Sequence, residues 1–275
     1  MIRRRFVDFD HGQIHYRSAG AKDAPPLLML HASPGSSRQL EPLNAEMAKT
    51  FRVIAPDTMG NGDSMPPPGD QPEIADYAQA VIGVADRLGL DRFRLYGTHT
   101  GARIACDIAL TWPGRIERLI LDGFGVYAPG DVEEILKLYA PEMTPDQQGA
   151  FVLQAWQFCR DQFIWFPWFR KEADRRVPHD LPDAEFLYAR YVEILKALGT
   201  YHQSYRAAFR YSMADHVPGI TRPTLITFAE NDLVRPAFDE ACALLPAAEA
   251  EVLPGIRTPE AVRITADRFT RFLLA

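Results

Sequence analysis

The chain has 275 residues, of which 47% are hydrophobic and 24% charged, with a formal net charge of −6. This composition is typical of a globular protein with a sizeable core, and its mixed charge offers neither a basic stripe for nucleic acid nor a polybasic patch for a membrane surface. No apolar run approaches the roughly 18 residues of a membrane-spanning helix, and three widely spaced cysteines favour reduced thiols. We expect a cytoplasmic protein whose partner is a small molecule, with a homodimer left open.

The first half of the chain alternates between apolar runs and helical patterns. Runs such as PLLML at 26–30 are continuously apolar, which is typical of strands buried on both faces of a parallel sheet. Strands are predicted at residues 3–9, 13–18, 26–30, 51–55, 93–96 and 116–121. Strands that alternate with helices indicate βαβ units. The prediction is an α/β fold with a doubly wound, mostly parallel sheet.

The character of the sequence changes between about residues 126 and 216. Buried-strand runs disappear, helical patterns dominate, and seven aromatic residues fall between Trp156 and Phe169, including Trp165 and Trp168. Aromatic side chains suit the roof of an apolar pocket, although they could also serve only to attach such a segment to the core. We interpret 125–216 as a helical cap. It is inserted into a core made of 1–124 and 217–275, where strands return at 224–229 and 250–253.

Residues 97–101, Gly-Thr-His-Thr-Gly, join a predicted strand directly to a helical pattern. A strand, a Gly-x-X-x-Gly turn and a helix make a nucleophile elbow, in which a sharp turn exposes the central side chain above the sheet. Ser, Cys or Asp normally occupies that central position. Here it is His99, so any chemistry must be argued around an imidazole.

Polar residues follow several of the predicted strands. His31, Asp122 and Asp232 each come just after a strand, as His99 does. The carboxyl ends of parallel strands meet at one edge of the sheet, which is where such folds bind ligands. The four side chains are therefore expected to converge, with His31, Trp165 and Trp168 in a substrate pocket. A metal site built from the four is a weaker alternative, because no local ligand pattern such as His-x-x-x-His is present. No metal and no cofactor are expected.

Four features together resemble the α/β-hydrolase fold, in its branch with a helical cap. They are the elbow, Asp232, the turn His31-Ala32-Ser33-Pro34-Gly35, and Asp57 followed by Gly60-x-Gly62-x-Ser64. The resemblance covers nearly the whole chain and is closest to epoxide hydrolases, haloalkane dehalogenases and small-ester hydrolases. It implies an oxyanion hole formed by the backbone N–H groups of Ser33 and Thr100. It also implies an elbow nucleophile, an acid, and a base histidine after the last strand.

The chain departs from that pattern at two of the three catalytic positions. His99 replaces the nucleophile, and no histidine follows His216, so the base is missing. The first hypothesis is a hydrolase of a small apolar ester, thioester or related carbonyl compound. In it, His99 is the nucleophile or the base for water, oriented by Asp232 or by Asp122. The N-terminus of the following helix is expected to keep His99 neutral.

Two alternatives remain. In one, His99 abstracts a proton from a substrate whose enolate occupies the oxyanion hole, which gives a cofactor-free lyase, isomerase or oxygenase. In the other, the fold has lost catalysis and binds a hydrophobic ligand, with His99 packed away from solvent. A cap residue could also supply the missing base in either catalytic case.

Overall fold

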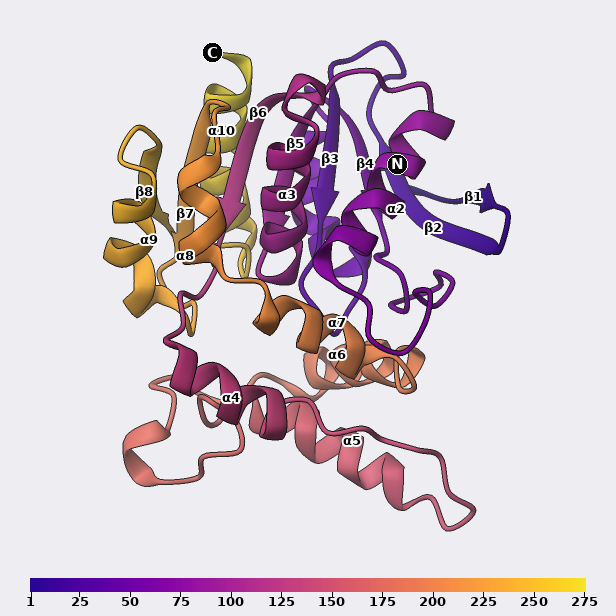
Figure 1. Ribbon diagram of the computed structural model, residues 1–275, viewed down its shortest axis with the longest axis vertical. Coiled ribbons are helices and arrows are strands. Elements are labelled where there is room, and N and C mark those ends of the chain that lie inside the picture. Colours follow the sequence, from indigo (N-terminus) through magenta and orange to yellow (C-terminus); the bar gives the residue numbers. More distant parts are fainter.

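One sheet of eight strands forms the centre of the protein (Figure 1). The computed structural model describes residues 1–275, with the side chain of Pro129 left aside. The strands are β1 (Arg3–Phe9), β2 (Gly12–Ala19), β3 (Pro26–Leu30), β4 (Arg52–Pro56), β5 (Phe93–Thr98), β6 (Ile116–Asp122), β7 (Thr224–Ala229) and β8 (Glu249–Leu253). Their order is β1-β2-β4-β3-β5-β6-β7-β8, antiparallel at the β1–β2 and β2–β4 pairs and parallel elsewhere.

Helices cover both faces of this sheet. In chain order, the helices of the protein are α1 (Glu41–Met47), α2 (Ile74–Arg87), α3 (Thr100–Thr111), α4 (Pro129–Leu138), α5 (Ala150–Asp161), α6 (Ala184–Lys196), α7 (Tyr201–Arg210), α8 (Met213–His216), α9 (Phe238–Leu244) and α10 (Pro259–Leu274). Figure 1 shows α10 behind the sheet and α2, α3 and α8 in front of it. Among the described residues, no helix is long and apolar enough to cross a membrane.

The alternation of side chains along β3 explains why this strand is continuously apolar. Leu27 and Met29 belong to the hydrophobic cluster under α1 and α10, whereas Leu28 and Leu30 belong to the cluster under α2 and α3. Since successive side chains of a strand point to opposite faces, a strand covered on both sides has no position left for a polar residue. All four side chains are fully buried. The predicted doubly wound α/β fold is confirmed.

The insertion between β6 and β7 forms a helical layer below the sheet in Figure 1. Its helices share a hydrophobic cluster of their own, built around Tyr139, Phe158 and Tyr201. α7 joins the two parts, because Ala207 and Ala208 belong instead to the cluster of the main core. Strand arrows such as β3 point toward this layer, so it lies over the carboxyl ends of the parallel strands.

α5 begins later than the helical pattern predicts. The helical pattern over residues 145–161 predicts a helix from Pro145, but α5 starts at Ala150. The Asp146 carboxylate accepts hydrogen bonds from the N–H groups of Gln148, Ala150 and Phe151. An aspartate that satisfies backbone donors ahead of a helix holds the chain in a turn and sets the start of the helix.

Strand register brings the functional segments to one level. Leu30 lies beside Gly97, Thr98 lies beside Asp122, and Asp122 lies beside Thr227. The turn after β3, the elbow after β5 and the loops after β6 and β7 therefore start side by side at the carboxyl edge of the sheet.

Two glycines allow α3 to begin directly against β3. A Cβ on Gly101 would lie 2.4 Å from the Leu30 carbonyl oxygen, and one on Gly97 would lie 2.1 Å from the Gly101 carbonyl oxygen. Both distances are far below any van der Waals contact, so the turn between them closes only without side chains. The position of His99 depends on this close approach.

Gly101→Ala should therefore destabilise the protein by about 2–3 kcal/mol, because the new methyl group must push α3 away from β3. Gly114→Ala is the matched control, since a Cβ at Gly114 meets no atom within 4 Å. The measurement is the free energy of unfolding in urea. Equal values for the two variants would show that the turn is not tightly constrained.

Candidate active site

His99 lies at the tip of the elbow in a strained backbone conformation. Its φ is 50° and its ψ is −110°, and among the described residues it is the one non-glycine residue with positive φ. The strain is held by hydrogen bonds, since His99 N–H donates to the Asp122 carbonyl at 3.0 Å and the His99 carbonyl accepts from Ala102 N–H at 3.1 Å. Such strain usually persists where it aims a functional side chain. The imidazole is 40% exposed, the opposite of what the non-catalytic alternative expects.

Asp232 is the carboxylate that contacts His99. Its Oδ2 lies 3.1 Å from His99 Nε2, and its Oδ1 accepts a hydrogen bond from Val234 N–H at 3.0 Å, which fixes the carboxylate after β7. Gly123 leaves room for this contact. At φ +59°, a Cβ on Gly123 would lie 2.4 Å from Asp232 Oδ2 and 3.1 Å from His99 Nε2. Any other residue at position 123 would separate the pair.

The two groups shift each other's titration. Burial alone would lower the pKa of His99, but the Asp232 carboxylate, with a smaller contribution from the Asp122 charge, outweighs it and raises the pKa above its usual 6.5. Burial would raise the pKa of Asp232, but His99 lowers it below its usual 3.8. The expectation that the helix N-terminus keeps His99 neutral is wrong, because a full charge in contact exceeds a helix dipole. The protonated His99, paired with Asp232, contributes to the stability of the folded protein. This contribution is fully present below pH 6.5 and is lost as the pH rises through the raised pKa of His99.

Asp122 is not the group that orients His99. Its Oδ2 accepts a hydrogen bond from Tyr96 Oη at 2.7 Å, and it touches the elbow through its backbone carbonyl. Burial raises the pKa of Asp122 to about 6, an effect that the Tyr96 hydrogen bond only partly offsets. The prediction that left Asp122 open as the orienting acid is wrong in this geometry.

Two cavities meet at His99. The large cavity has a volume of about 710 Å³ and the small cavity about 290 Å³, and the walls of both include His99, Asp232, Arg190 and Arg257. Ser33 and Thr100 line the small cavity. The two residues predicted to form an oxyanion hole therefore share a wall with the imidazole.

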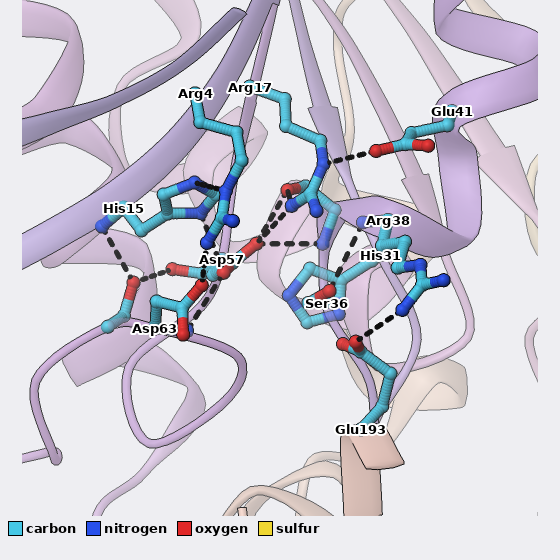
Figure 2. A network of polar contacts seen from close by, with 12 residues as sticks. Arg4, His15, Arg17, His31, Ser36, Arg38, Glu41, Asp57, Asp63 and Glu193 are labelled. Atoms are coloured by element: carbon cyan, nitrogen blue, oxygen red, sulfur yellow. Dashed lines mark hydrogen bonds and ion pairs between the residues drawn. The ribbon is translucent and has the colours of Figure 1, made fainter. Parts of the chain in front are cut away.

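His31 does not line either cavity. It is fully buried, its Nδ1 lies 2.8 Å from the Ala32 carbonyl, and its Nε2 accepts a hydrogen bond from Thr58 N–H at 2.9 Å. Figure 2 shows it beside the polar network around Asp57. The prediction of His31 as a pocket residue is wrong, because both ring nitrogens are used to join the turn after β3 to the loop after β4.

Trp165 and Trp168 are absent from the walls of both cavities as well. Trp168 Nε1 donates to the Tyr139 carbonyl at 2.8 Å, and its ring packs edge-on against Phe158. Trp165 stacks under the Lys171 ammonium group. Both make these contacts with other cap residues and line neither cavity, so their prediction as pocket residues is wrong; Phe163 lines both cavities instead.

One cluster in the described chain has ligand atoms close enough to hold a metal, namely His15, Asp57 and Asp63 (Figure 2). Its atoms are already engaged. The Asp57 carboxylate accepts from Ser37 N–H at 2.9 Å and Asp63 N–H at 3.0 Å and pairs with His15 Nδ1 at 2.8 Å. Arg4 contacts both His15 and Asp63. These groups fix the loop after β4. In the described residues, His31 does not join His99, Asp122 and Asp232 in a group of ligand atoms close enough to hold a metal, so the weaker metal-site prediction is wrong.

Most of the chain matches a known protein family. The model of the α/β hydrolase fold family matches residues 25–244, a span that contains both His99 and Asp232. The chain belongs to the α/β hydrolase fold family.

Individual relatives agree with that assignment. Carboxylesterase YbfK of Bacillus subtilis is 27% identical over 256 residues, which cover 90% of this chain and 79% of that protein. Haloalkane dehalogenase 2 of Mycobacterium tuberculosis is 32% identical over 117 residues, so the match spans 42% of this chain and 40% of that relative.

Solved structures show the same fold. Carboxylesterase CesB (YbfK) from Bacillus subtilis superposes with a TM-score of 0.70 at 24% identity, covering 99% of this chain and 92% of that one. Epoxide hydrolase A from Mycobacterium thermoresistibile gives 0.74 at 18% identity, covering 98% of each chain. At these identities the likeness concerns the fold alone.

Within this α/β hydrolase fold, three wall residues were missed by sequence reasoning: Arg103, Arg190 and Arg257. Arg257 lies in the loop after β8, where the resemblance implied a catalytic histidine. Its position in the sequence could therefore have placed it near the site. Arg103 comes one helical turn after His99 on α3, which also placed it near the site. Arg190 lies within an amphipathic cap helix, where nothing in the sequence separates a cavity-lining arginine from a solvated one.

The raised pKa of His99 can be tested by following its ring resonances by NMR. In the wild type, His99 should titrate above pH 6.5. Asp232→Asn should move the titration to lower pH, because the Asp232 charge no longer opposes the lowering of the His99 pKa by burial. Asp10→Asn is the control, since it removes an exposed carboxylate in the β1–β2 hairpin. A His99 titration that is the same in Asp232→Asn and wild type would show that the pair is not formed.

Proposed function

We propose that the protein is a hydrolase of a small apolar ester, thioester or related carbonyl compound, with the His99–Asp232 pair as its general base. The observation that carries the proposal is the 3.1 Å contact between His99 Nε2 and Asp232 Oδ2 at an elbow that opens into both cavities. A carboxylate on one ring nitrogen fixes the tautomer and supports the imidazolium that forms when the other nitrogen takes a proton. The name of the relative YbfK, a carboxylesterase, supports an ester as the substrate.

In the proposed reaction, Asp232 holds His99 Nε2 and leaves Nδ1 to act on water. Nδ1 removes a proton as the water oxygen attacks the acyl carbon, and the carbonyl oxygen becomes an oxyanion. The imidazolium then returns the proton to the departing alkoxide or thiolate. The products are a carboxylic acid and an alcohol or thiol, so one histidine serves first as base and then as acid.

The oxyanion needs donors that are free before the reaction. In the part of the chain that the structure describes, the backbone N–H groups of Ser33 and Thr100 have no acceptor, and both residues line the small cavity. Thr100 is the first residue of α3, where the helix leaves its N–H groups without internal partners. Preorganised donors of this kind can contribute about 3–4 kcal/mol to transition-state stabilisation.

A base and an oxyanion hole are also the groups required to remove a proton next to a carbonyl, so proton abstraction without hydrolysis is the second candidate. The raised pKa of His99 is the observation that favours it, because a stronger base suits a carbon acid. Exchange of deuterium from solvent into an added ketone, measured by NMR, separates the two candidates. Exchange without ester cleavage would replace the hydrolase proposal.

His99→Ala should reduce hydrolysis of a small ester such as p-nitrophenyl acetate by about 10²–10⁴-fold, the usual contribution of a general base. His11→Ala, which truncates an exposed histidine in the β1–β2 hairpin, is the matched control and should retain activity. The measurement is kcat/KM for each purified variant. Wild-type turnover by His99→Ala would reject His99 as base and as nucleophile.

Rapid quenching followed by intact mass spectrometry distinguishes the base from the nucleophile. If His99 activates water, no acyl group accumulates on the enzyme. An acetyl adduct on the peptide that contains His99, formed and lost at the rate of turnover, would instead make His99 the nucleophile.

A further inference from the structure

The walls of the small cavity carry more positive than negative charge. They include three arginines, Arg103, Arg190 and Arg257, and one carboxylate, Asp232. Asp232 is already matched to His99 at 3.1 Å. Asp232 also lies close enough to Arg257 to interact with it, so Arg103 and Arg190 are the two guanidinium groups with no acid of their own in these walls.

Arg103 is a buried cation held without a carboxylate. It is 5% exposed, its Nη2 donates to the Gly125 carbonyl at 3.0 Å, and its Nη1 donates to the His99 carbonyl at 3.4 Å. Its Nε has no hydrogen-bond partner among the described residues. A buried charge is costly unless it is paired. An anion in the adjoining cavity would supply the missing charge.

Arg190 reaches the same cavity from the cap. The hydrogen bond that the described residues give it is long, 3.5 Å from Nη2 to the Pro34 carbonyl in the turn after β3. Glu193, one turn later on α6, is a buried carboxylate whose charge acts on Arg190, but no hydrogen bond joins the two, and its Oε1 lies 3.9 Å from Arg38 Nη1. The Arg190 guanidinium thus retains donors for a ligand, and a guanidinium binds a carboxylate through two parallel hydrogen bonds.

Aromatic side chains form a large part of the apolar walls of the small cavity. They include the side chains Tyr139, Phe163, Phe166, Tyr205 and Phe209. Aromatic walls favour a flat, apolar ligand body, which they contact edge-on or face-on. An anionic group on an aromatic body therefore fits both the charge and the shape of the walls.

We propose that the small cavity is a binding site for the carboxylate of an aromatic acid, with Arg190 as its direct partner and Arg103 as supporting charge. Resting on the proposed function, this narrows the substrate to an ester, thioester or related carbonyl compound whose apolar body is aromatic and carries one free carboxylate. The carboxylate binds at Arg190, and the scissile carbonyl lies at His99.

The test is isothermal titration of the full-length protein with sodium benzoate and with benzamide, its neutral counterpart of the same shape. Benzoate should bind the wild type at least about tenfold more tightly than benzamide, as expected for a charge-assisted pair in a partly buried site. Arg190→Met should remove that preference while leaving benzamide binding in place, and Arg190→Lys should retain part of it. Arg176→Met, which removes an exposed arginine of the cap, should bind both compounds as the wild type does.

Two results would overturn the proposal: equal affinity of the wild type for benzoate and benzamide, or an unchanged preference in Arg190→Met. Thermal melting checks that each variant is folded, and Arg190→Gln replaces Arg190→Met if the latter is not. Benzoate has no bond to cleave, so its binding does not depend on His99 acting as base. A benzoate preference together with full activity of His99→Ala would reject the base alone, whereas loss of activity without the preference would reject the carboxylate site alone.

Discussion

The close approach of α3 to β3 is the constraint on which the rest of the site depends. Gly97 and Gly101 allow the chain to turn from strand to helix within a few residues, and the turn forces His99 into positive φ. A side chain on a strained, hydrogen-bonded turn has little freedom to move, which is what a preorganised catalytic group requires. Register along the parallel strands then brings the loop of Asp232 and the turn of Ser33 to the same edge.

The elbow, the acid after β7 and the sheet could be predicted because each leaves a local mark in the sequence. Continuous apolar runs mark strands covered on both faces, and Gly97 and Gly101 flank His99 at the spacing that a tight turn requires. The pocket walls left no such mark. Trp165 and Trp168 lie in an irregular segment, where spacing does not say which side chain faces a cavity, and both contact other cap residues instead. His31 was misassigned because its place after a strand is also the place of a structural hydrogen-bonding residue.

The charge state of His99 illustrates a second limit of sequence reasoning. The N-terminus of α3, which disfavours an imidazolium, could be predicted from the sequence. The pKa of His99 is nevertheless raised, because the Asp232 carboxylate, about 130 residues later, lies in direct contact with the ring. Long-range pairs of this kind depend on Gly123 leaving space for them, and that requirement becomes visible only once the loops are placed. Helices and strands can thus be predicted from local sequence, whereas the electrostatics of the site depend on contacts between residues far apart in the chain.

The insertion of the cap between β6 and β7 has a consequence for how such a protein can diverge. His99 and Asp232 both belong to the core, whereas Arg190 and most of the aromatic wall of the small cavity belong to one contiguous stretch of the cap. Because β6 and β7 are neighbours in the sheet, that stretch begins and ends at nearly the same place. Replacing the cap segment between β6 and β7 with that of another family member would still bridge the same short distance between the two strands. It would leave the strained turn at His99 unchanged. Under the proposed function, the cap therefore selects the substrate and the core carries out the reaction.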